Sequence, residues 1–89
     1  MDEQLRTRLE KLQDELDRTA PADAGAQEHV AEVRRDVQDL IERGGQAPSE
    51  RRRSLLERLR NVIPFVESTH PNLTLAMSEV VDELTRMSL

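Results

Sequence analysis

The chain has 89 residues, enough for one small domain, and is 36% hydrophobic and 35% charged with a single aromatic residue. It contains no cysteine, which excludes disulfides and thiolate metal sites. The net charge of −5 argues against general affinity for nucleic acids. Residues 1–20 hold no apolar secretory segment, and no apolar run approaches the roughly 18–20 residues that span a bilayer. We therefore expect a cytoplasmic protein that does not enter membranes.

The first predicted helix runs from about Asp2 to Arg18. Its apolar residues recur at spacings of four, three and four, which is the a/d pattern of a narrow helical seam. They are Leu5, Leu9, Leu12 and Leu16. A stripe one residue wide favours packing against another helix, in the same chain or in a second copy.

Pro21 and Gly25 separate this helix from the next, which should begin between Pro21 and Ala26 with Asp23 as a plausible N-cap. The second helix repeats the three-four rhythm, and Gly44-Gly45 supplies the glycine that commonly ends a helix. Its apolar stripe consists of Val30, Val33, Val37, Leu40 and Ile41.

The third helix should open at Pro48 or Ser49 and carries a wider stripe: Leu55, Leu56, Leu59, Val62, Ile63 and Val66. Pro64 removes a backbone donor near the end of this pattern. This proline predicts that the helix kinks or ends early, with Ile63 in an extended conformation. Phe65 and Val66 would then pack against the core.

The fourth helix has the clearest start, because Pro71 suits a first helical position and Thr69 or His70 can cap it. Its apolar residues follow at spacings of four and three. They are Leu73, Met77, Val80, Leu84 and Met87.

Three acid-first i,i+4 pairs support these helices, each worth about 0.2–0.5 kcal/mol. They are Asp14–Arg18, Asp39–Arg43 and Asp82–Arg86.

The predicted fold is all-α, and residues 1–89 are expected to form a single domain. Its four helices should be arranged as two antiparallel hairpins. The hairpin of residues 1–43 is highly charged, and the hairpin of residues 48–89 is more apolar. The pair can form a single four-helix bundle or a coiled-coil-like dimer. Whether residues 1–43 pack within the chain or onto another copy stays open.

The run Leu55-Leu-Glu-Arg-Leu59 is followed by a block that reads Phe-x-x-Ser-x-His-Pro-x-Leu-Thr over residues 65–74. This pattern resembles a family of short bacterial proteins catalogued as a domain of unknown function. The resemblance extends over essentially the whole chain and implies a helical bacterial protein. It implies no activity, so no catalytic residue is carried over.

Two histidines are candidate site residues. His70 can act as a ligand or proton carrier at a helix start, but the structural interpretation is favoured, in which Thr69, His70 and Pro71 only begin the helix. His29 shares a face with Glu32 and neighbours Glu28, yet so few ligands do not complete a metal site without a second copy. We therefore predict no metal, no cofactor and no catalytic residue.

The block of residues 44–63 is basic, and Arg51, Arg52 and Arg53 stand in a helix first turn, where they oppose the helix dipole. With Arg58 they form a possible interaction patch for phosphates or an acidic protein surface. No aromatic residues are interleaved for stacking on bases, so a solvated or intersubunit salt-bridge role is favoured.

The thin apolar content favours association, because backbone ordering alone costs roughly 1–2 kcal/mol per residue. We therefore predict a non-enzymatic protein–protein interaction module that is a homo-oligomer, with a dimer favoured, and that binds an unknown protein partner. The alternative is a nucleic-acid-associated protein that uses Arg51–Arg53. An enzyme with a pocket around His70 is the least favoured class.

Overall fold

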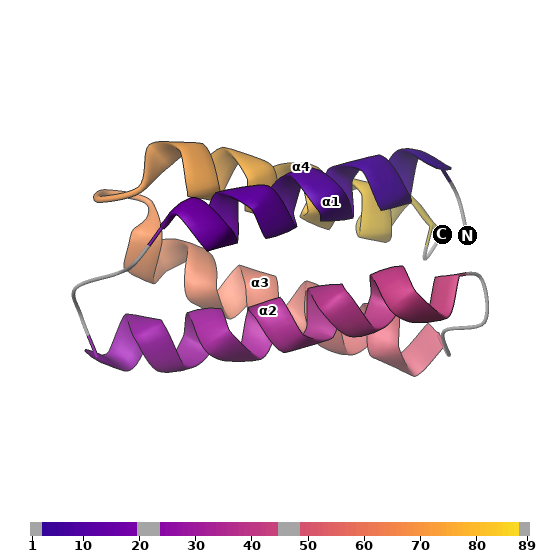
Figure 1. The fold of residues 1–89 in the computed structure, drawn as a ribbon, viewed down its shortest axis with the longest axis horizontal. Helices are drawn as coiled ribbons and strands as arrows, with labels where there is room; N and C mark the ends of the chain where they lie inside the picture. The colour runs from indigo at the N-terminus through magenta and orange to yellow at the C-terminus, as the bar shows by residue number, and fades with distance from the viewer. Residues whose placement is uncertain (1–2, 20–23, 45–48, 88–89) are drawn as a thin grey trace.

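A computed structural model describes residues 3–19, 24–44 and 49–87, and over this part the chain forms four α-helices (Figure 1). They are α1 (Glu3–Arg18), α2 (Ala24–Arg43), α3 (Ser49–Val66) and α4 (Pro71–Met87). Both α1 and α3 pack against α2 and α4, so the helices surround one core. The predicted all-α class is confirmed, and the single chain forms a four-helix bundle.

Cross-helix contacts show how neighbouring helices are oriented. Gln4 at the start of α1 accepts a hydrogen bond of 2.6 Å from Arg86 at the end of α4. Arg51 Nε, near the start of α3, lies 3.7 Å from Asp39 Oδ2, near the end of α2. The start of α1 thus lies beside the end of α4, and the start of α3 lies beside the end of α2.

The core is built from the apolar stripes of all four helices, but Met87, which was predicted to belong to the α4 stripe, is 38% exposed and lies outside the core. In α1 the stripe of four leucines is fully buried, at 0% exposure. This stripe therefore packs within its own chain, so α1 needs no second copy to cover it. The remaining buried apolar residues are Val30, Val33, Val37, Leu40, Leu55, Leu56, Leu59, Val62, Val66, Leu73, Ala76, Met77, Val80 and Leu84.

The predicted early end of α3 at Pro64 and the extended conformation of Ile63 are wrong. Helix α3 continues through Pro64 to Val66, and Ile63 is helical. The Ile63 carbonyl accepts a 2.9 Å hydrogen bond from the Glu67 amide, so helical bonding resumes directly after the proline. Pro64 has no N–H to donate to the Arg60 carbonyl one turn earlier. Because Pro64 is exposed, that unpaired carbonyl lies on the solvent side of the helix.

Phe65 is therefore also placed differently from the prediction. Val66 is buried, but Phe65 is 53% exposed. Successive residues of an unbroken helix are rotated by about 100° from one another. Of these two consecutive residues, Val66 is the one that points into the core.

The helix ends follow from local backbone chemistry. Gly44 follows α2 with a φ of +58°, a conformation that glycine adopts without strain. Between α3 and α4, the Val66 carbonyl accepts a 2.7 Å hydrogen bond from the His70 amide. Helix α4 then begins at Pro71, whose missing N–H is not needed there. Asp23, Gly45 and Pro48, which were expected near helix ends, lie outside the described residues.

Leu9→Ala tests the burial of the α1 stripe within the chain. We expect the free energy of unfolding to fall by about 2–5 kcal/mol, because the truncation leaves a cavity in the core. Urea denaturation followed by circular dichroism measures it, with the exposed Thr7→Ala as control, expected to change stability by less than about 0.5 kcal/mol. Equal stability of the two variants would contradict a leucine stripe packed within the chain.

Candidate functional site

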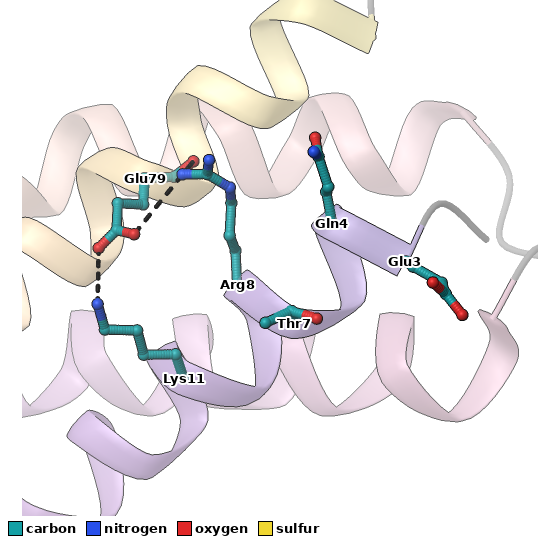
Figure 2. Close-up of a pocket in the computed structure, with 6 residues that line it drawn as sticks. All are labelled: Glu3, Gln4, Thr7, Arg8, Lys11 and Glu79. Carbon is teal, nitrogen blue, oxygen red and sulfur yellow. Dashed lines mark hydrogen bonds and ion pairs between the residues drawn. The ribbon is translucent and has the colours of Figure 1, made fainter.

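A hollow of about 470 Å³ lies on the surface between α1 and α4 (Figure 2). Helix α1 supplies most of its lining, and α4 supplies one carboxylate. The lining residues are Glu3, Gln4, Thr7, Arg8, Lys11 and Glu79.

The charged side chains of this hollow are engaged with one another. Lys11 Nζ donates a 2.9 Å hydrogen bond to Glu79 Oε1. Arg8 Nη1 lies 3.6 Å from Glu79 Oε2 and donates a 3.4 Å hydrogen bond to the Glu79 backbone carbonyl. Figure 2 shows both cationic side chains reaching from α1 toward Glu79 on α4. These contacts join the two helices.

Glu83 on α4 is the single buried charged residue in the described part of the chain, at 2% exposure. Arg8 Nε lies 3.2 Å from Glu83 Oε1, and Arg86 donates a hydrogen bond to Glu83 Oε2. A buried carboxylate requires such partners, because desolvation would otherwise make its charge costly. Arg8 therefore connects Glu83 to Glu79 across the junction of α1 and α4.

The sequence analysis missed Glu83, although a pattern in α4 could have found it. Ala76, Val80, Glu83 and Met87 recur at spacings of four, three and four beside the leucine stripe. A glutamate on such a stripe is expected at the edge of the core. Its partner Arg8 lies on another helix and could not be assigned from periodicity.

The second hollow, of about 340 Å³, lies where the end of α1 meets the start of α4. The predicted helix-start residues Thr69, His70 and Pro71 line it together with Arg18 and Glu15. His70 is half-buried, and its carbonyl accepts 3.0 Å hydrogen bonds from the Thr74 amide and hydroxyl. The backbone of His70 thus serves the first turn of α4.

The four arginines of the predicted patch are not equivalent in the structure. Arg58 pairs with Glu32 and lies 2.8 Å from Asp36 Oδ2, although its N–H does not point at that oxygen. Arg51 Nε lies 3.7 Å from Asp39 Oδ2. Arg52 is half-buried and also has an interaction partner. Arg53 is exposed and forms no ion pair with any described residue. Two of the four arginines therefore join α3 to α2.

His29 stacks on Phe65, with ring centroids 5.1 Å apart and planes inclined by 25°. Glu32, the other candidate ligand on that face, pairs with Arg58 instead. Across the described ranges, no three His, Cys, Asp or Glu side chains are grouped in a way that could hold a metal ion. No helix in these ranges is both long and apolar enough to cross a membrane.

The fold and its surface define a small all-α protein: a four-helix bundle with an apolar core and ion pairs between neighbouring helices. A family model matches residues 5–89, and the chain belongs to that family, described as Domain of unknown function (DUF4404). The resemblance to a family of unknown function is thus confirmed. No curated protein and no solved structure matches the chain.

The role of Arg8 and Arg86 can be tested by replacing both with methionine. We expect Arg8→Met/Arg86→Met to lower the free energy of unfolding by about 3–5 kcal/mol, because Glu83 stays buried without a countercharge. Adding Glu83→Met should restore most of this loss, as measured by urea denaturation. Lys11→Met is the control and should cost less than about 1 kcal/mol, since its pair with Glu79 is largely exposed. A triple variant no more stable than the double would contradict a charge-compensating role.

Proposed function

We propose that this protein is a non-enzymatic, cytoplasmic interaction module that associates with a second copy and binds another protein through its outer faces. The observation that carries this proposal is the exposure of large apolar side chains, of which Phe65 and Leu75 are the most exposed and Met87 is the third, on a bundle whose core is already closed. Phe65 is 53% exposed and Leu75 is 58% exposed. Aromatic and large apolar side chains are typical of the desolvated centres of protein interfaces.

Phe65 has the features of an interface residue. It is the only aromatic residue of the chain, and its ring is held on the imidazole of His29. A side chain that is already ordered loses little conformational entropy when a partner covers it. The exposed ring therefore offers apolar contact area in a fixed position.

The buried stripes restrict where association can occur. The apolar stripes of α1 and α2 are covered inside the bundle, so they offer no surface to another copy. Any second copy must contact outward-facing side chains instead. A bundle that keeps its own fold and associates through such residues fits a reversible interaction better than an intertwined dimer.

The polar side chains of the surface hollow support a structural role over a reactive one. Arg8 and Lys11 pair with Glu79, Arg8 also pairs with the buried Glu83, and these contacts connect α1 with α4. A group engaged in this way is a poor candidate for general acid or base chemistry, which needs access to a substrate proton. This supports the non-enzymatic part of the proposal.

The nucleic-acid alternative receives less support. A phosphate would have to compete with Glu32 and Asp36 for Arg58, and with Asp39 for Arg51. Those carboxylates also place negative charge beside the arginines, which opposes a polyanion. The protein-binding function is therefore preferred.

Sedimentation equilibrium tests self-association. We expect a reversible monomer–dimer equilibrium with a dissociation constant in the micromolar range, as suits a small interface between folded partners. A strict monomer at high micromolar concentration would contradict the homo-oligomer.

Phe65→Ser tests the protein-binding part, using affinity capture from the native host. The wild type should recover a protein that Phe65→Ser loses, because serine removes the exposed ring without disturbing the core. Arg35→Ser, at an exposed position on α2, is the control and should recover the same protein. Recovery of identical proteins by all three baits would argue against Phe65 as the contact.

Retention on a DNA column separates the two functions. We expect the wild type and a variant with Arg51, Arg52 and Arg53 replaced by glutamate to elute together at low salt. Retention of the wild type alone, falling steeply with salt, would favour the nucleic-acid alternative.

A further inference from the structure

We draw no further inference here: the strongest candidate, the hollow beside Arg18 and His70 where the end of α1 meets the start of α4, carries nothing because it rests on a helix N-terminus and no second feature of the described residues points to a ligand there.

Discussion

The constraint on which this structure depends is that four narrow apolar stripes must be covered at once. No helix of this chain carries enough apolar surface to be stable alone, since most helical stability in proteins comes from packing an amphipathic face. The closed ring of four helices covers each stripe with the others, and the leucines of α1 are fully buried in it. A core of Leu, Val and Met is thereby completed within one chain of 89 residues.

Much of this fold could be predicted from periodicity and helix breakers. The apolar stripes that begin at Leu5 and at Leu73 lie in helices close to the predicted ranges. A spacing of three and four residues places side chains on one face of an α-helix and does not fit a β-strand. Pro64 shows the limit of local rules. At an exposed position, the proline loses one hydrogen bond that solvent can replace, and the packing of Val62 and Val66 keeps the helix continuous.

Electrostatic partners were less predictable than helices. Asp39 and Arg43 form the expected i,i+4 pair at 2.9 Å, but Arg18 contacts Glu15, and Arg86 contacts Glu83. For Arg86 the reason is burial: a carboxylate at 2% exposure gains more from a countercharge than the exposed Asp82 does. Sequence spacing alone does not show which side chains are buried, so it could not identify Glu83 rather than Asp82 as the partner of Arg86. The candidate site between α1 and α4 was missed for the same reason.

Competition between carboxylates for the same arginine also determines which charged side chains stay unpaired on the surface. Buried or half-buried carboxylates such as Glu83 and Asp36 engage the arginines nearest to them at the α1–α4 and α2–α3 junctions. Other charges, Arg53 and Asp82 among them, are exposed and form no ion pair with a described residue. A charge in this position contributes little to the stability of a single chain, where surface electrostatics are weak. Its energetic effect is larger when a second molecule excludes water around it, so an unpaired surface charge can affect binding of a partner without affecting the fold.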